Sequence, residues 1–180
     1  ALIRRSLAKA GLTPLNTSPS AGGKPVMLVV VEWFSAAHSI YRTHSRTLEA
    51  ARELFHVVGM GYAGTVDQPG RAVFDEFIDI GSGEVLQQIA QIRAVAREKA
   101  AQILYMPSVG MFSLTMYLCN LRLAPVQAMA LGHPATSHSP EMDFVVVEDD
   151  YVGDPACFSE QLLRLSLIHI SEPTRRRGIS

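Results

Sequence analysis

The stretch VMLVVVEWF, residues 26–34, decides the fold of this chain. It is a continuous apolar run rich in β-branched residues, without the alternation of polar and apolar positions that a half-exposed strand shows. Such a run is typical of a strand that is buried on both faces of a parallel sheet. Four further segments predict strands: FDEFIDI (74–80), QILYMP (102–107), VQAMALG (126–132) and DFVVVED (143–149).

Helical patterns lie between these strands. The spacing of apolar residues predicts helices over 45–59 (capped by Ser45 and ended by Gly59), 84–100 and 111–123, and a final helix that begins at Asp154. His56 falls inside the first of these helices, where we interpret it as a packed or surface histidine. Strands that alternate with helices imply right-handed crossovers. The predicted fold class is therefore α/β, a Rossmann-like open parallel sheet with helices on both faces.

Composition limits the possible classes of protein. A chain of 180 residues that is 48% hydrophobic and 18% charged is long enough for one domain with a sizeable core. Its formal net charge of −1 gives no basis for binding nucleic acid or an anionic membrane. The longest apolar run, 25–31, is too short to span a bilayer, so no membrane insertion is expected. Cys119 and Cys157 lie far apart and form no redox motif, which favours a reducing cytoplasm.

Three segments of the chain differ in character. Residues 1–24 are predicted to be the last turns of a helical region followed by a linker rich in Ser, Pro and Gly. Residues 25–164 carry the predicted Rossmann-like domain. Residues 165–180, LSLIHISEPTRRRGIS, break the pattern and resemble the translation of a sequencing adapter. We interpret them as a non-native tail and leave them out of the predicted fold.

Polar residues follow the carboxyl ends of several predicted strands, where parallel sheets bind their ligands. His38 and Arg42 follow the first strand, and Gly132, His133 and Thr136 follow VQAMALG. Gly132 lets the backbone approach a ligand closely, and His133 and Thr136 supply hydrogen-bond donors. Two structural interpretations stay open. His133 then only braces a tight Gly-Pro turn, and Arg42 only pairs with a carboxylate on a solvated face.

Several chemistries lack their motifs. There is no G-x-G-x-x-G after the first strand and no G-x-S-x-G elbow, so neither a dinucleotide site nor a hydrolase triad is supported. The spacing of His133 and His138 is too loose for a tight metal-ligand motif. The acidic run 148–150 is explained equally well as a cap and turn before the next helix. No metal site is therefore predicted.

Five motifs occur in the order in which a known family carries them: YRTHS (41–45), VDQPGRAVFDEF (66–77), LYMPSVGM (104–111), CNLRLAPVQAMALGHPATSHS (119–139) and VEDDYVGDPACFSEQLLRL (147–165). With them, almost all of 25–164 resembles the bacterial cytoplasmic N-glycosyltransferases that glucosylate asparagines of adhesins. These enzymes are distant relatives of O-GlcNAc transferase. The sequence departs from several relatives at Trp33 and Ser35, where they carry histidines.

This resemblance implies a GT-B enzyme, in which two Rossmann-like halves face each other across a cleft, and this chain matches the N-terminal, acceptor-side half. The activity implied is inverting, metal-independent transfer of glucose or another hexose from a UDP-sugar to asparagine in Asn-x-Ser/Thr sequons. The partners implied are the UDP-sugar and an acceptor polypeptide such as an adhesin, with no further cofactor and a cytoplasmic location. The C-terminal half, with most nucleotide contacts, is not covered, so the chain alone is expected to be inactive.

The resemblance also assigns roles to individual residues. His38 matches the first-loop histidine that the family requires for activity, in charge stabilisation or in proton transfer. The other residues implied, as substrate-binding positions, are Arg42, Gly132, His133 and Thr136. A different class of function stays open from the residues themselves: a non-catalytic Rossmann-like domain that binds a nucleotide or a peptide.

Overall fold

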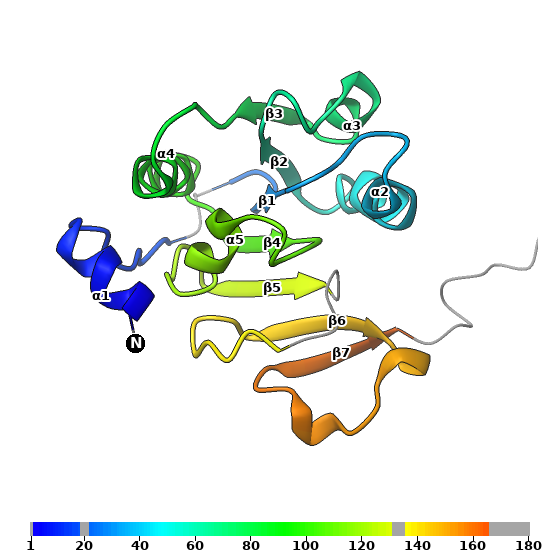
Figure 1. Ribbon diagram of the computed structural model, residues 1–180. Helices are drawn as coiled ribbons and strands as arrows, with labels where there is room; N and C mark the ends of the chain where they lie inside the picture. Colours follow the sequence, from blue (N-terminus) through cyan, green and yellow to red (C-terminus); the bar gives the residue numbers. More distant parts are fainter. Residues whose placement is uncertain (1, 19–21, 131–135, 166–180) are drawn as a thin grey trace, which may run out of the picture.

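The computed structural model describes residues 2–18, 22–130 and 136–165. Its strands form a single sheet in which all neighbours run parallel, in the order β3-β2-β1-β4-β5-β6-β7 (Figure 1). The strands are β1 (Val26–Val30), β2 (His56–Gly61), β3 (Glu76–Asp79), β4 (Ile103–Met106), β5 (Val126–Ala130), β6 (Phe144–Glu148) and β7 (Gln161–Leu165). The α-helices are α1 (Leu2–Lys9), α2 (Ser39–Ala51), α3 (Gln68–Ala72), α4 (Val85–Glu98) and α5 (Ser113–Leu118). The predicted Rossmann-like α/β fold is confirmed.

The strand β1 lies in the interior of this sheet, between β2 and β4. Its side chains alternate between two cores. Leu28 and Val30 pack in the core under α4 and α5, whereas Val29 and Val31 pack in the core under α2 and the segment that contains α3. In Figure 1, α4 and α2 accordingly lie on opposite sides of β1 and β2. Burial on both faces explains why this stretch of sequence is apolar without interruption.

The predicted helix over 45–59 is wrong in its bounds. The helix α2 covers Ser39–Ala51, and His56–Gly61 form the strand β2, which the sequence pattern did not separate from the helix. Gly59 does not end a helix. A Cβ at this position would lie 2.6 Å from the ring of Phe74, so the glycine allows that ring to pack directly on the strand backbone.

His56 therefore opens a strand and does not lie within a helix. Its ring nitrogens lie 3.9 Å from the carboxylate of Asp75 and 3.7 Å from that of Glu76. It stands at the amino end of β2, on the edge of the sheet opposite the carboxyl ends of the strands. His56 thus serves as a natural control for the histidines that follow β1.

The predicted final helix is also wrong. Two short 3-10 turns, Asp149–Tyr151 and Pro155–Cys157, follow β6, and Gln161–Leu165 form the edge strand β7 parallel to β6. The backbone of β6 gains a hydrogen-bonded neighbour in this way, which outweighs the weak helical pattern of the segment. Of the predicted tail 165–180, only Leu165 belongs to the described residues.

The remaining predicted elements agree with the structure. The helix α4 lies within the predicted 84–100, and the strands β1, β3, β4, β5 and β6 lie within their apolar runs. The helix α5 is shorter than the predicted 111–123, because it ends at Leu118 before the chain turns into β5. The connection from β5 to β6 contains no helix in its described part, residues 136–143.

The loop after β1 is held by the segment that leads into α3. The N–H of Phe34 donates to the carbonyl of Thr65 at 3.0 Å, and the N–H of Ala36 donates to Asp67 Oδ2 at 2.9 Å. Asp67 also caps α3 by accepting from the N–H of Gly70 at 2.9 Å. A Cβ at Gly70 would lie 2.0 Å from the carbonyl oxygen of Phe34. The two segments approach so closely that only glycine fits.

We predict that Gly70→Ala lowers the free energy of unfolding by about 1–3 kcal/mol, because the backbone of α3 must move away from the loop. Urea denaturation measures this change. The matched control is Gly64→Ala, since a Cβ at Gly64 meets no atom within 4 Å. Equal stabilities for both variants would contradict the close packing of α3 on this loop.

Candidate functional site

The strand order reverses its direction between β1 and β4, since the chain runs from β1 toward β3 on one side and from β4 toward β7 on the other. Open parallel sheets bind ligands at this switch point, outside the carboxyl ends of the strands. We call this side of the sheet the carboxyl edge. The loops that flank the switch point are residues 31–38 after β1 and residues 107–112 after β4.

His38 lies in the first of these loops and is the N-cap of α2. Its Nδ1 accepts a hydrogen bond from the N–H of Ile40 at 3.3 Å. A neutral imidazole with an accepting Nδ1 carries its proton on Nε2. The ring stacks on Trp33, with centroids 6.1 Å apart and an interplanar angle of 23°. The cap and the stack together hold His38 in one orientation.

Arg42 lies one turn further along α2, and it braces the same loop. Its Nη1 donates to the carbonyl of Ala37 at 2.6 Å, and its backbone N–H donates to the carbonyl of His38 at 3.3 Å. Within the described parts of the chain, Arg42 forms no ion pair with a carboxylate, so the solvated-pair interpretation lacks support. His38 and Arg42 thus lie together where the loop after β1 enters α2.

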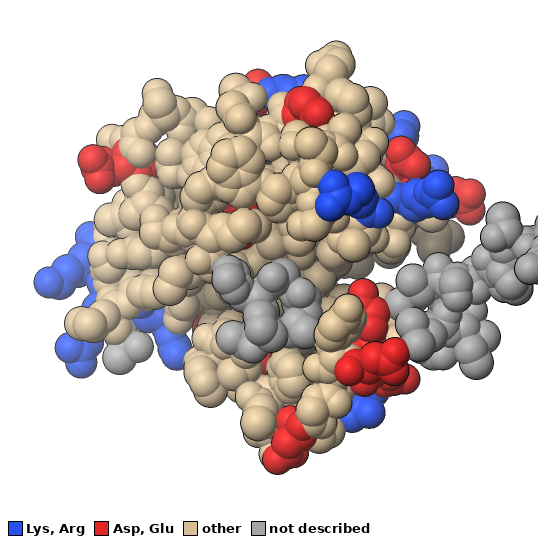
Figure 2. All heavy atoms as spheres, turned by 45° about the vertical axis from the view of Figure 1, so that its right-hand side comes forward, with Lys and Arg blue, Asp and Glu red and all other residues tan. Residues whose placement is uncertain are grey.

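Charged side chains occupy only parts of the surface on the side where α2 lies. Most of the face in Figure 2 is formed by uncharged residues, and Lys and Arg side chains lie on the side where α2 lies as well as on the opposite side, where α1 lies. Asp and Glu side chains gather over the segment that follows β6.

A second histidine of the same motif, His44, points toward the sheet. Its Nδ1 lies 3.2 Å from the carbonyl of Ile40, and its ring lies 6.4 Å from that of Tyr105. Burial lowers the pKa of His44, although the backbone carbonyl and the charge of Glu148 oppose this effect. His44 is therefore neutral at neutral pH and packs between α2 and the sheet.

Thr136 lies on the face of the sheet covered by α5, away from α2. Its hydroxyl lies 2.6 Å from Glu160 Oε2 and 2.6 Å from Ser159 Oγ, and it accepts from the N–H of Ser159 at 2.9 Å. This hydroxyl is already committed to partners within the protein. Within the described residues, no contact joins Thr136 to His38 or Arg42, and its predicted ligand contact stays a prediction. The other two predicted positions, Gly132 and His133, lie outside the described residues.

Glu160 is a residue of this region that the sequence pattern missed. It is 7% exposed, and it accepts from the N–H of Ser137 at 2.8 Å as well as from the hydroxyls of Ser137 and Thr136. Burial alone would raise its pKa, but these hydrogen bonds to Ser137 and Thr136 outweigh burial and lower it. Its partners lie 23 and 24 residues earlier in the chain, so no local motif marks it.

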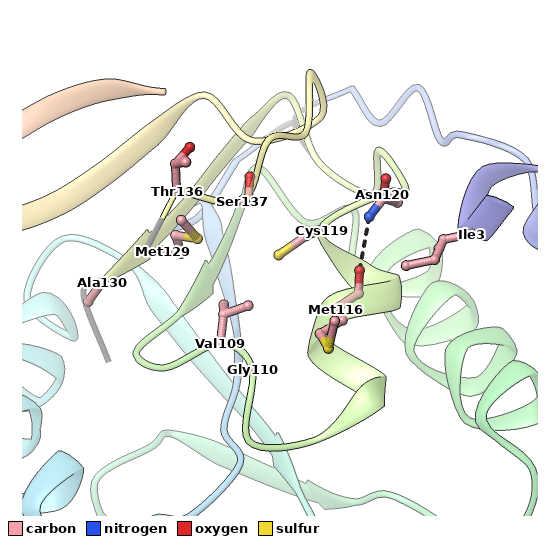
Figure 3. A pocket seen from close by; sticks show the side chains of 10 residues that line it. All are labelled: Ile3, Val109, Gly110, Met116, Cys119, Asn120, Met129, Ala130, Thr136 and Ser137. Atoms are coloured by element: carbon pink, nitrogen blue, oxygen red, sulfur yellow. Dashed lines mark hydrogen bonds between the residues drawn. The ribbon is translucent and has the colours of Figure 1, made fainter. Parts of the chain in front are cut away.

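A cavity of about 410 Å³ lies between α5 and Thr136 and Ser137, the two residues that are hydrogen-bonded to Glu160 (Figure 3). Its wall is formed by Ile3, Val109, Gly110, Met116, Cys119, Asn120, Met129, Ala130, Thr136 and Ser137. Burial, followed by the charges of Glu160 and Glu32, raises the pKa of Cys119 to about 12. The thiol in this wall is therefore neutral at pH 7 and acts as an apolar group.

Neither a metal-binding cluster nor a membrane-spanning helix is found among the described residues. Residues 2–18, 22–130 and 136–165 contain no group of three or more His, Cys, Asp or Glu side chains placed to hold a metal ion. Over the same residues, every helix is too short or too polar to cross a bilayer.

We predict that Glu160→Gln lowers the free energy of unfolding at pH 7 and that this loss shrinks as the pH falls. The folded pKa of Glu160 lies below its unfolded value, so its stabilisation is complete above the unfolded pKa of about 4.3 and disappears as the pH falls through the folded pKa. The loss at pH 7 should be about 1.5–3 kcal/mol, the range for hydrogen bonds to a charged group.

Urea denaturation at pH 7 and pH 3 measures this difference between the variant and the parent chain. The exposed Glu98, changed to Gln, is the matched control, for which we expect no comparable loss at either pH. A loss for Glu160→Gln that is the same at both pH values would show that its charge does not hold Thr136 and Ser137.

Comparison with known proteins gives relatives of two kinds. The chain is 54% identical over 142 residues to the UDP-glucose:protein N-beta-glucosyltransferase of Actinobacillus pleuropneumoniae serotype 5b, and 55% identical over 142 residues to that of serotype 7. Each match covers 79% of this chain and 23% of the relative. No protein-family model matches the chain.

Among solved structures, a mutant O-GlcNAc transferase from Thermobaculum terrenum is similar, with a TM-score of 0.65 and 21% identity. This likeness covers 91% of this chain and 33% of that chain, and it supports the fold alone. The sequence identity to the Actinobacillus proteins is much higher, but it covers a smaller share of those relatives. By sequence, this chain is similar to one part of the UDP-glucose:protein N-beta-glucosyltransferases, and it spans 23% of the length of the relatives that it matches.

Proposed function

We propose that this chain is part of an inverting, metal-independent glycosyltransferase that moves glucose from UDP-glucose to asparagine in Asn-x-Ser/Thr sequons. The acceptor is a polypeptide such as an adhesin, the location is the cytoplasm, and the donor is needed without a further cofactor. The observation that carries the proposal is the 54% identity over 142 residues to a UDP-glucose:protein N-beta-glucosyltransferase. That relative is an enzyme, which favours catalysis over a purely binding Rossmann-like domain.

The chain contributes one half of the catalytic cleft in this proposal. The N-terminal Rossmann-like half of a GT-B enzyme presents its carboxyl edge to the opposite half. The loops at the switch point then face the donor and the acceptor. Because the chain spans 23% of its relatives, the contacts to the uridine and most of the diphosphate are assigned to parts of the protein outside this sequence.

The reaction makes a specific demand on this edge. Attack of the acceptor nitrogen on the anomeric carbon expels a diphosphate, and the developing negative charge must be met by N–H donors or cations in a site without a metal. Arg42 and the N-terminus of the 13-residue helix α2 supply positive charge beside His38. His38 is proposed as the catalytic residue. The substrate-binding positions proposed are Arg42, Gly132, His133 and Thr136.

The geometry of His38 supports one of its two possible roles. Its Nδ1 is engaged by the N–H of Ile40, so the neutral ring has a hydrogen-bond donor at Nε2 and no free acceptor. A ring in this state can stabilise an anionic leaving group by donating from Nε2. It cannot take a proton from the acceptor without giving up the cap or changing tautomer. We therefore propose that His38 acts by charge stabilisation and not as a general base.

We predict that the matched segment of this chain supports catalysis when it replaces its counterpart in the Actinobacillus enzyme. In this chimera, His38→Ala should lower kcat by about 10²–10³-fold, the usual cost of one charge-stabilising group. His56→Ala is the matched control, because His56 lies at the opposite edge of the sheet and should leave kcat unchanged. Glucosylation of an Asn-x-Thr peptide, followed by mass spectrometry, measures the rates. A folded chimera whose His38→Ala variant keeps normal turnover would contradict the assignment.

We also predict that the isolated chain transfers no glucose, because the opposite half of the cleft is needed to hold the donor. The chain is incubated with UDP-glucose and the same peptide, and the products are examined by mass spectrometry. The active chimera serves as the positive control. A glucosylated peptide from the isolated chain would show that these residues form a complete donor site.

A further inference from the structure

Glu32 is a buried charged residue to which none of the features above gives a role. It follows β1 directly and is 1% exposed. Its Oε1 accepts from the N–H of Phe112 at 2.8 Å and from the hydroxyl of Thr115 at 2.6 Å. These partners lie 80 and 83 residues later in the chain. One carboxylate oxygen therefore joins the two loops that flank the switch point.

The arrangement is a capping box assembled from distant parts of the chain. Phe112 is the N-cap of α5 and has no side chain that could cap the helix. In a local capping box, the residue at the third helical position accepts from the N–H of the N-cap residue. That position is Thr115, whose hydroxyl instead donates to Glu32. The carboxylate after β1 thus takes over the cap of the helix after β4.

A single aromatic ring, that of Trp33, lies between this cap and His38. The ring of Phe112 packs against that of Trp33 with centroids 6.0 Å apart, and Trp33 stacks on His38. Trp33 is 38% exposed, so burial alone does not hold the three rings in register. Fixing the backbone of Phe112 fixes the far end of the stack. The hydrogen bond from Phe112 to Glu32 therefore bears on how the imidazole is held.

Burial of the Glu32 side chain lowers the stability of the fold, so a purely structural role does not explain this residue. Its second oxygen, Oε2, is buried and has no hydrogen-bond partner among the described residues. Buried polar atoms without partners are rare in proteins and cost stability. An apolar side chain would avoid that cost in a core that serves only to fold. A carboxylate in this buried position therefore points to a task at the site.

We propose that Glu32 is a positioning residue for His38. It fixes Phe112, and through the Phe112–Trp33–His38 stack it sets the orientation of the imidazole at the carboxyl edge. The proposal rests on the catalytic role of His38 proposed above. Its first test, however, uses a property of this chain that is independent of sugar transfer.

The spectroscopic test uses Trp33, which is the single tryptophan of the sequence. Near-UV circular dichroism and acrylamide quenching of fluorescence therefore report on this stack. We expect Glu32→Ala to lose the tryptophan band and to increase quenching while the far-UV spectrum stays the same. Glu32→Gln keeps an acceptor for Phe112 and should retain the parent signals. The exposed Glu53, changed to Ala, is the matched control and should also retain them.

If Glu32→Ala does not fold, Glu32→Asp takes its place. It keeps the charge but is too short to reach the N–H of Phe112, so it should lose the tryptophan band as well. A folded Glu32→Ala or Glu32→Asp variant with the parent near-UV spectrum and quenching would overturn the proposal. So would loss of both signals in Glu32→Gln to the same extent as in Glu32→Ala.

A kinetic test in the active chimera separates positioning from stability. We expect Glu32→Asp to lower kcat by about 10- to 100-fold, as misplaced catalytic groups do, with a smaller change in KM. Because Glu32 acts through His38, the double variant with His38→Ala should be no slower than His38→Ala alone. Losses that multiply in the double variant would overturn the proposal. An inactive chimera contradicts the proposed function. The spectroscopic test of Glu32 does not depend on the activity of the chimera.

Discussion

Burial of β1 on both faces is the constraint on which the rest of the structure depends. A strand in the interior of a parallel sheet must satisfy its backbone on both sides and its side chains above and below. Here β2 and β4 provide the backbone hydrogen bonds on both sides of β1, and two separate cores bury its side chains above and below the sheet. Because all strands are parallel, their carboxyl ends meet at one edge. The loops after β1 and β4 are therefore brought together whatever sequence they carry, and the residues within them decide what the edge can do.

Carboxylate side chains then fix the connections that lack long helices. The helix α5 is six residues long, and the described part of the next connection has no helix at all. Glu32 caps the first of these, Glu160 holds the second, and Asp143 accepts from the N–H of Gln127 at 2.8 Å where β5 begins. Each of them pairs with a segment remote in sequence. In this half of the sheet, side-chain acceptors satisfy the backbone donors that helical turns satisfy elsewhere.

The sequence predicted the regular parts of this structure and missed the parts that depend on distant contacts. Continuous apolar runs identified β1, β4, β5 and β6, and the 3.6-residue period identified α4, because these signals are local. The strand β2 was hidden by Gly59, which resembles a helix terminus but serves the packing of Phe74. The strand β7 was hidden because its pairing with β6 depends on neither propensity nor period. The position of His38 and Arg42 after β1 could be inferred, whereas the partners of Glu32 and Glu160 could not, since no spacing rule connects them.

The central claim of this account is that His38 is held as a hydrogen-bond donor, with Nδ1 bound by the N–H of Ile40 and the proton on Nε2. Nitrogen NMR of this chain with isotopically labelled histidine measures the tautomer directly, and the His38 signals are identified by their loss in His38→Ala. At a pH where the ring is neutral, we expect an unprotonated Nδ1 and a protonated Nε2. A His38 ring that carries its proton on Nδ1, or that exchanges freely between both tautomers, would contradict the cap and the role built on it.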